Sequence, residues 1–578
     1  MGAGNAAGAG SIAGGPSGDE TAAVQPMPSG ESAGRSRDGA GAAGRGFERY
    51  LPHLVVFLSS MGVMIVELVA SRLVSKYFGS SLYTWTGIIG VVLGGISLGN
   101  YMGGRLADRF PPRRIISVLL LASSLLTFLI LALDLLLYRI LDRGAFAGVT
   151  AGMVARSVLL IVAFFFLPST ALGTISPVMA KYALAAGRRV GNTVGSIYAM
   201  SAIGSIVGTF LAGFVLIPLL GITTIVALVG SLMALLALIM GPFRLVSAAW
   251  LAAAGVGVLF LYTPEAGFVL YDAGSGESRL LFATDSMYSH IEVRDMNRGG
   301  GRERILIQDG LIHNRYDPES PDELLYEYER IFDALTRQRV AELEGSAAPL
   351  DTLTLGGGGC VYPMILQRRY PGSRNEVVEI DPEVLEIAQR YFGLDPASGL
   401  RLVAADARNY VHSLAAESAR GPKGASRTAG AAGRYDLVYI DAFNSFSVPY
   451  HLTTKEFTGM IARLLDDGGI LMTNCVDVFT VGRFLNAYLN TLREVFPHVA
   501  VFHDPGYSQG IRSTFVLAAA YEPIAQEVLR DPEGNVVGQR MAEESLAELQ
   551  QRNGPMVLTD TFAPVENLIA PVFLHSVD

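Results

Sequence analysis

The residues best suited to chemistry in this 578-residue chain are a glycine run and three acids in its second half. The glycines stand in 352-TLTLGGGGCVYP-363, and the acids are Glu379, Asp406 and Asp441. Glycines between an apolar strand and a helix let the backbone approach a nucleotide-like ligand closely. No Lys-Ser/Thr pair follows them, which excludes the phosphate loop of P-loop NTPases. The run alone is weak evidence for a nucleotide-like ligand, and the acids that follow it make this interpretation stronger.

Each of the three acids ends a short apolar run, where a carboxylate could contact a bound nucleoside. Glu379 follows the glycines by about twenty residues, the spacing at which a carboxylate reaches both ribose hydroxyls in dinucleotide folds. Asp406 could accept a hydrogen bond from an adenine amino group, and Asp441 would face the same crevice. A single aspartate at a strand end is often only a helix N-cap or a turn former. Here the glycine run and the three acids give four such features at successive strand ends of one sheet, and together they favour a ligand site.

A parallel sheet is needed to bring these residues together, and the surrounding pattern predicts one. Strand-like segments at 351–356, 375–381, 400–406 and 435–443 alternate with helix-like segments from residue 350 onward. This alternation is typical of an α/β Rossmann-like, methyltransferase-type domain with helices on both faces. Upstream, 289-SHIEVRDM-296 and 303-ERILIQDG-310 alternate as antiparallel strands do.

The first half of the chain predicts a multi-pass α-helical membrane domain. Mean hydropathy is +0.37 and 50% of residues are hydrophobic, with the excess lying between residues 53 and 262. Apolar runs of bilayer-spanning length are predicted at 53–75, 82–104, 115–137, 156–179, 193–219, 222–241 and 246–262. Small residues within 195–213 predict close helix packing.

Basic residues after the second and fourth runs place the N-terminus and these two connections in the cytoplasm by the positive-inside rule. Seven crossings would then leave the C-terminal half outside, away from any adenosyl cofactor. Either 246–262 does not cross or the orientation is reversed. We expect a multi-pass protein of the cell (inner) membrane with a cytoplasmic catalytic part.

Other features exclude some roles. Residues 1–46 are rich in Gly and Ala, predict disorder and lack the pattern of a cleaved signal peptide. The net charge of −9 argues against a nucleic-acid partner. Cys360 and Cys475 give neither a disulfide framework nor metal-ligand spacing, and no metal is expected.

Three polar positions allow two interpretations each. Glu67 is costly in hydrocarbon, so it should face other helices and pair with Arg72, either as a structural pair or as a polar site for a polyamine or proton. His313 and His451 could lie near the nucleoside site. A surface or packing role is favoured for both histidines over catalysis.

The order of glycine loop, 379-EID-381, 406-DAR-408 and 435-YDLVYIDAF-443 resembles the polyamine aminopropyltransferase (spermidine synthase) family. The upstream segments 288-YSHIEVRD-295 and 321-PDELLYEYERI-331 resemble its N-terminal β domain and substrate loop. The apolar half, with 103-GGRLADRFPPRR-114, resembles the membrane-bound form fused to a major-facilitator-like segment. The domains implied are a disordered tail (1–50), a transmembrane domain (51–263), a β subdomain (266–345) and a Rossmann-like domain (346–578).

The resemblance implies a role for each site residue. Asp441 would be the catalytic base that deprotonates an attacking amine, which must lose a proton before it can attack a sulfonium-activated carbon. The implied cofactor residues are Gly356, Gly357, Gly358, Glu379, Asp406, Ala407 and Ser289. The implied substrate residues are Asp309, Asn444, Glu327 and Tyr326.

The sequence also departs from the family pattern. Gly359 stands where the family loop has an acid, and Asn444 stands where its second amine-binding acid would be. Ser289 replaces a glutamine, and 326-YEY-328 replaces Y-H-E. The nucleoside side is therefore kept, whereas the amine side carries less negative charge, for which Asp309, Asp322, Glu323 and Glu327 could compensate.

The function implied is transfer of an aminopropyl group from decarboxylated S-adenosylmethionine to an amine such as putrescine. This transferase activity would give a spermidine-type polyamine and methylthioadenosine. Two alternatives stay open: a methyltransferase that uses S-adenosylmethionine, and a non-catalytic membrane sensor or transporter for a polyamine or nucleoside. The expected partners are these small molecules and the lipid bilayer, and the membrane part could be an anchor, a half-unit or part of a homodimer.

Overall fold

The computed structural model describes residues 39–78, 82–141, 153–185, 189–261, 278–298, 301–342, 349–420, 435–442 and 448–575. The first of these residues, from Gly39, already form the start of a helix, and the rest of the predicted tail lies outside the described ranges. All packing described below lies within residues 51–578.

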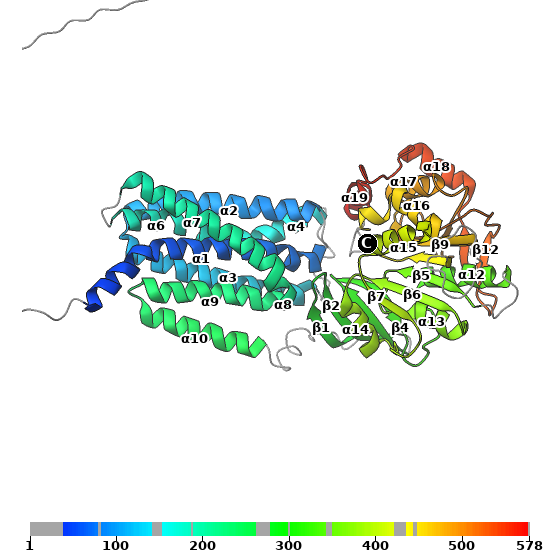
Figure 1. Ribbon diagram of the computed structural model, residues 1–578, viewed down its shortest axis with the longest axis horizontal. Helices are drawn as coiled ribbons and strands as arrows, with labels where there is room; N and C mark the ends of the chain where they lie inside the picture. Colours follow the sequence, from blue (N-terminus) through cyan, green and yellow to red (C-terminus); the bar gives the residue numbers. More distant parts are fainter. Residues whose placement is uncertain are drawn as a thin grey trace, which may run out of the picture. The chain divides into compact units, whose positions relative to one another are not determined.

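The N-terminal half of the described chain is helical (Figure 1). Its helices are α1 (Gly39–Phe78), α2 (Leu82–Arg109), α3 (Pro112–Leu141), α4 (Met153–Ile161), α5 (Leu167–Gly173), α6 (Ile175–Leu184), α7 (Val190–Leu211), α8 (Ile217–Leu219), α9 (Ile222–Met240) and α10 (Arg244–Leu261). Short π-helical turns, η1 (Val162–Phe166) and η2 (Ala212–Leu216), join α4 to α5 and α7 to α8.

Six helical segments within the described ranges are long and apolar enough to cross a membrane. They are Tyr50–Tyr77, Leu82–Arg109, Pro112–Leu137, Ala155–Leu184, Val190–Leu219 and Ile222–Met240. The seventh predicted run forms α10, which is shorter in its described part. α10 nevertheless packs on α3, because Trp250 Nε1 donates to Ser124 Oγ at 2.8 Å and its ring meets Phe128 edge-on.

The predicted close helix packing is confirmed where α7 crosses α1. A Cβ atom on Gly204 would lie 2.2 Å from the carbonyl oxygen of Phe57, and one on Gly208 would lie 2.5 Å from that of Met61. Only glycine lets two helix backbones approach this closely.

A four-stranded sheet follows, in the order β1-β2-β3-β4. Its strands are β1 (Ser278–Asp285), β2 (His290–Arg298), β3 (Gly301–Gln308) and β4 (Leu311–Tyr316). All neighbouring pairs are antiparallel, as the alternating sequence predicted. Helix α12 (Glu327–Glu342) leads from this sheet to the next.

The C-terminal part is built on a nine-stranded sheet of order β12-β13-β10-β11-β9-β8-β5-β6-β7. The strands are β5 (Asp351–Leu355), β6 (Arg374–Glu379), β7 (Arg401–Ala404), β8 (Tyr435–Ile440), β9 (Leu465–Asp477), β10 (His498–His503), β11 (Ser513–Ala520), β12 (Val528–Arg530) and β13 (Val536–Arg540). The helices among them are α13 (Val361–Arg369), α14 (Pro382–Tyr391), α15 (Ala407–Arg420), α16 (Lys455–Leu464), α17 (Phe484–Arg493), α18 (Glu543–Asn553) and α19 (Val565–His575).

The predicted parallel sheet is confirmed for β9-β8-β5-β6-β7. Both of its faces are covered. In β8, Val438 and Ile440 belong to one hydrophobic core, while Leu437 and Tyr439 belong to the other. Since side chains alternate along a strand, a fully buried strand requires packing on both faces. The antiparallel extension through β10 to β13 was not predicted.

Strand order reverses between β5 and β8, because the chain runs from β5 out to β7 and then returns to β8. In open α/β sheets, ligands bind beside such a switch point, at the carboxyl ends of the strands. The glycine run and Asp441 lie directly after these two strands.

Candidate functional site

A cavity of about 840 Å³ opens at this edge of the sheet. The ends of β5, β6 and β8 line one side, and the turns of the small antiparallel sheet line another. Residues from the start of α12, the end of β9 and the start of β11 complete the wall. The cavity therefore draws on segments more than 200 residues apart in the sequence, from Tyr288 to Thr514.

The glycine loop is held against Glu379. Gly357 N donates to Glu379 Oε2 at 2.8 Å and Gly358 N donates to the same oxygen at 3.3 Å. The other oxygen, Oε1, accepts from Asp381 N at 3.1 Å. Burial raises the pKa of Glu379, against the effect of these amide donors. Glu379, Gly356 and Gly358 line the cavity. Gly357 does not line it, but its amide donates to Glu379 and so helps to hold that carboxylate in place.

Gly356 can only be glycine in this backbone. Its φ is +97°, and a Cβ atom there would lie 2.3 Å from the carbonyl oxygen of Asp441. Such a contact would push β5 and β8 apart at the point where the cavity opens.

Asp406 caps the following helix and also lines the cavity, and its predicted contact with adenine stays a prediction. Its Oδ1 accepts from Asn409 N at 2.8 Å in the first turn of α15, and its Oδ2 lies 3.4 Å from His451 Nε2. Asp406, Ala407 and His451 all line the cavity. The capping role fixes the carboxylate at the cavity edge.

Asp441 lies at the end of β8 with a donor on each carboxylate oxygen. The hydroxyl of Tyr328 donates to Oδ2 at 2.6 Å, and Asn474 Nδ2 donates to Oδ1 at 2.9 Å. Burial raises the pKa of Asp441, while these two hydrogen bonds lower it. A carboxylate with a raised pKa, fixed orientation and access to a cavity is suited to accept a proton.

Tyr328 and Asn474 were not predicted as site residues. Tyr328 belongs to 326-YEY-328, but helical periodicity alone did not indicate which of these side chains faces inward. Asn474 lies near the end of β9, the strand beside β8. Its place near a strand end is the sequence feature that could have identified it as a site residue.

Two predicted substrate acids do not line the cavity. Asp309 sits in the β3–β4 turn at φ 45°, and its Oδ1 accepts from His290 N at 2.9 Å. Glu327, the first residue of α12, is exposed, whereas the next residue, Tyr328, is buried. Neither carboxylate lines the cavity in this structure, and their role in holding an amine stays a prediction.

The remaining predicted residues have mixed positions. Ser289 and Tyr326 line the cavity, with Ser289 Oγ 3.5 Å from Gln308 Oε1 and the Tyr326 hydroxyl donating to the carbonyl of Ile312 at 2.8 Å. Burial raises the pKa of Tyr326 to about 12. Asn444 lies outside the described residues.

Gly359, the fourth glycine of the run, has no room for a side chain. A Cβ atom on Gly359 would lie 2.7 Å from Asn314 Oδ1 and 3.0 Å from the ring of Phe392. A buried amide from β4 thus leaves no space for a side chain at position 359. Burial, together with the charge of Asp441, raises the pKa of nearby Glu329 well above its ordinary range.

Two arginine side chains, Arg315 and Arg512, also line the cavity. Arg315 Nη1 pairs with Glu303 Oε1 at 2.8 Å and its guanidinium lies over the Tyr326 ring. Arg512 also lines the cavity and makes no ion pair within the described ranges. His313 lines it too, and burial lowers the pKa of this histidine to about 4, which keeps the imidazole neutral.

Both cysteines are free and buried, and burial raises the pKa of each thiol. Cys360 adopts φ 55° at the entrance to α13. Within the described ranges, no group of three or more His, Cys, Asp or Glu side chains could hold a metal ion.

No family model matches the chain. In sequence it is 33% identical over 177 residues to a polyamine aminopropyltransferase of Vibrio vulnificus, covering 30% of this chain and 53% of that protein. It is 28% identical over 157 residues to the eEF1A lysine and N-terminal methyltransferase of Mus musculus, covering 26% of this chain and 20% of that protein. The chain thus spans about half the length of the first of these curated relatives and about a fifth of the second.

Among solved structures, a probable spermidine synthase from Corynebacterium glutamicum covers 50% of this chain and 98% of that chain, with 23% identity and a TM-score of 0.39. The sequence similarity shows that part of the chain is homologous to polyamine aminopropyltransferases. Within the described ranges, six apolar helices precede the sheets.

Proposed function

We propose that the C-terminal part transfers an aminopropyl group from decarboxylated S-adenosylmethionine to an amine such as putrescine. The observation that carries this proposal is the buried Asp441 carboxylate, oriented by Tyr328 and Asn474 beside a cavity whose other wall is Glu379 and the glycine loop. The similarity to polyamine aminopropyltransferases supports it.

The cofactor would lie along the carboxyl edge of the sheet. Glu379 would accept hydrogen bonds from the ribose hydroxyls, and Asp406 with Ala407 would contact the adenine. Gly356 and Gly358 would adjoin the aminopropyl chain, and Ser289 would contact the cofactor from the β1–β2 turn. Each of these residues lines the cavity.

In the reaction, the acceptor amine loses a proton to Asp441, and its nitrogen lone pair attacks the aminopropyl carbon bonded to sulfur. The new C–N bond forms as the C–S bond breaks, and the sulfur keeps that electron pair as the neutral thioether of methylthioadenosine. Tyr328 and Asn474 donate to the two Asp441 oxygens and would keep the carboxylate oriented for this proton transfer. A base positioned in this way contributes about 10²–10⁴-fold to rate.

A second candidate is methyl transfer from ordinary S-adenosylmethionine. The similarity to a methyltransferase favours it. So does Arg512, since a cation on the cavity wall suits the carboxylate that ordinary S-adenosylmethionine keeps and its decarboxylated form lacks.

Both are tested with purified full-length protein in lipid nanodiscs, given either donor and a panel of mono- and diamines. Methylthioadenosine formed only with the decarboxylated donor is the expected result. S-adenosylhomocysteine formed from the ordinary donor would support methyl transfer instead. Nucleoside binding without either product would overturn both candidates and leave a sensor.

For the membrane part, we propose a multi-pass protein of the cell (inner) membrane with a cytoplasmic catalytic part, since the adenosyl donor is expected in the cytoplasm. Arg72 and Lys76, near the end of α1, contact the small sheet. Arg113, Arg114 and Arg244 lie together where α3 and α10 begin. If the catalytic part is cytoplasmic, these three arginines lie on the outer side of the membrane, which is contrary to the positive-inside rule. A reporter fused after Asp578 decides between the two sides.

A further inference from the structure

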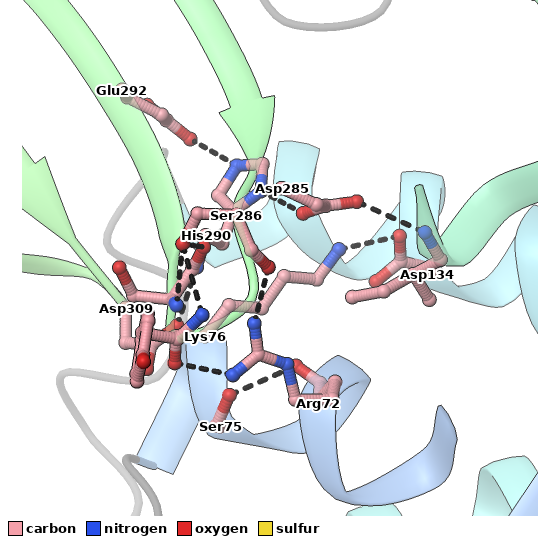
Figure 2. A network of polar contacts seen from close by, with 12 residues as sticks. Arg72, Ser75, Lys76, Asp134, Asp285, Ser286, His290, Glu292 and Asp309 are labelled. Atoms are coloured by element: carbon pink, nitrogen blue, oxygen red, sulfur yellow. Dashed lines mark hydrogen bonds and ion pairs between the residues drawn. The ribbon is translucent and has the colours of Figure 1, made fainter. Parts of the chain in front are cut away.

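The end of helix α1 contacts both turns of the small sheet that reach the cavity. Arg72 donates through Nη1 to the carbonyl of Tyr288 and through Nη2 to that of Ser286, the latter at 2.6 Å (Figure 2). In the second turn, a Cβ atom on Gly310 would lie only 2.7 Å from the carbonyl oxygen of Lys76. One membrane helix therefore braces two separate turns.

Both turns belong to the cavity wall. Tyr288 and Ser289 line the cavity from the β1–β2 turn, and Gly310 lines it from the β3–β4 turn. A displacement of the end of α1 would thus move residues that line the cavity. This displacement would not have to be transmitted through the core of the large sheet.

A chain of hydrogen bonds continues from Arg72 to the predicted ribose site. Ser286, whose carbonyl accepts from Arg72, donates through Oγ to Asp381 Oδ2. Asp381 lines the cavity, caps α14 by accepting from Glu383 N at 3.1 Å, and donates its own amide to Glu379 Oε1 at 3.1 Å. The path from the membrane helix to Glu379 has only two intermediate residues.

The charges around Arg72 favour its position. Carboxylates whose charges act on it are Asp309, Asp285 and Asp381, all of which follow α10 in the sequence. Glu67, the predicted partner, makes no ion pair within the described ranges. The expected pairing of Glu67 with Arg72 is therefore wrong, because the guanidinium reaches the sheet turns instead.

Neighbouring helices add to the contact. Lys76 Nζ pairs with Asp134 Oδ2 of α3 at 2.6 Å (Figure 2). Asp285 Oδ2 accepts from Ile222 N at the start of α9 at 3.2 Å, and Oδ1 lies 2.6 Å from His290 Nδ1. Helices α1 and α9 thus contact the end of β1 and the β1–β2 turn directly, and α3 supports α1 through Lys76.

We propose that Arg72 is a positioning residue for the adenosyl-ligand cavity, so that the membrane helices set the affinity of the soluble part for its cofactor. A guanidinium can hold two carbonyl groups at once in a fixed fork, which an ammonium group cannot reproduce. By thermodynamic reciprocity, ligand binding must in turn stabilise the contact between α1 and the turns. This inference rests on the proposed function for the identity of the ligand.

The test compares full-length wild type, Arg72→Gln and Arg72→Lys in nanodiscs. Lys181→Gln is the matched control, since Lys181 also pairs with an acid, Asp108, but neither residue lines the cavity. Methylthioadenosine and S-adenosylhomocysteine are the binding probes. We expect Arg72→Gln to weaken binding of the tighter probe about tenfold, Arg72→Lys to recover part of it, and the control to bind as wild type.

Turnover supplies a second readout. At saturating donor, Arg72→Gln should keep kcat within about twofold while KM for the donor rises by the same factor as Kd, because the base Asp441 is untouched. Hydrogen exchange on wild-type protein needs no variant: a saturating probe should slow exchange in 70–77 and 282–290.

The outcomes separate the two proposals. Wild-type protein that binds a nucleoside, with equal affinity in Arg72→Gln and no protection of these peptides, overturns this inference alone. Binding that depends on Arg72 without turnover of either donor overturns the catalytic proposal and keeps this one. Wild-type protein that binds neither probe overturns both.

Discussion

The hydroxyl of Tyr328 lies 2.6 Å from Asp441 Oδ2 and donates to it, joining the first turn of α12 to the end of β8. Asn474 completes the arrangement on Oδ1. A carboxylate whose two oxygens accept from fixed donors loses little conformational entropy when a substrate binds. Its orientation therefore stays suited to accept a proton as a general base.

Replacing Asp441 by Asn should lower turnover by about 10²–10⁴-fold, because the amide cannot accept the amine proton. Affinity for methylthioadenosine should stay within about twofold, since Asn keeps the volume of Asp and the ribose site is untouched. Calorimetry and a product assay on the same preparation provide the measurement. Unchanged turnover in this variant contradicts the assignment of Asp441 as base.

Replacing Tyr328 by Phe should move the acid limb of the kcat/KM profile to higher pH. The tyrosine hydroxyl stabilises the Asp441 carboxylate and lowers its pKa against the effect of burial, so its loss raises that pKa further. Tyr326→Phe is the control, because the Tyr326 hydroxyl donates to the carbonyl of Ile312 instead. If both variants keep the wild-type limb, Tyr328 does not act on the base.

Adding a side chain at Gly359 should destabilise the fold. The new Cβ atom would lie 2.7 Å from Asn314 Oδ1, so Gly359→Ala should cost about 1–3 kcal/mol in the free energy of unfolding. The double variant Asn314→Ala with Gly359→Ala should recover part of that cost. Chemical denaturation of the nanodisc-bound protein measures it, and additive effects would show that the two sites do not meet.

Replacing His290 by Gln should reduce stability in a pH-dependent way. Despite the opposing effect of burial, hydrogen bonds to Asp285 and Glu292 raise the pKa of His290 from 6.5 to about 10, while its charge lowers the pKa of each carboxyl to about 2. The stabilisation from His290 is complete below its unfolded value of 6.5 and is lost as pH rises through about 10. That from the acids is complete above about 4.5 and is lost as pH falls through about 2.

The difference in Tm between wild type and His290→Gln should therefore be largest between about pH 5 and 6.5 and shrink toward pH 10. The exposed His412→Gln is the control. A constant difference across this range would mean that the ring acts by packing and carries no charge.

Replacing Arg512 by Gln distinguishes the two candidate donors. Removing a cation from the cavity wall should lower KM for a diamine about three- to tenfold if the protein transfers aminopropyl groups. Selective loss of S-adenosylhomocysteine binding would instead assign Arg512 to a ligand carboxylate. Arg390→Gln, which removes an exposed pair with Glu386, is the control.

The sequence by itself determined which residues meet at the carboxyl edge of the parallel sheet. Alternating strand and helix segments after residue 350 predicted the parallel sheet, and the carboxyl ends of parallel strands meet at one edge. The glycine loop, Glu379, Asp406 and Asp441 were therefore expected together, and all of these acids line one cavity. Local pattern was sufficient because each residue ends a strand of predictable direction.

Only the tertiary structure decided which other residues line the cavity and which side chains contact Asp441. Asp309 and Glu327 lie in a turn and at a helix start, where the direction of a side chain depends on packing with distant segments. Tyr328 and Asn474 reach Asp441 from 113 and 33 residues away, and Asn314 fills the space beside Gly359 from another strand. Arg72 contacts a turn more than 200 residues later. Periodicity assigns residues to elements, but contacts between elements arise only when the whole chain has packed.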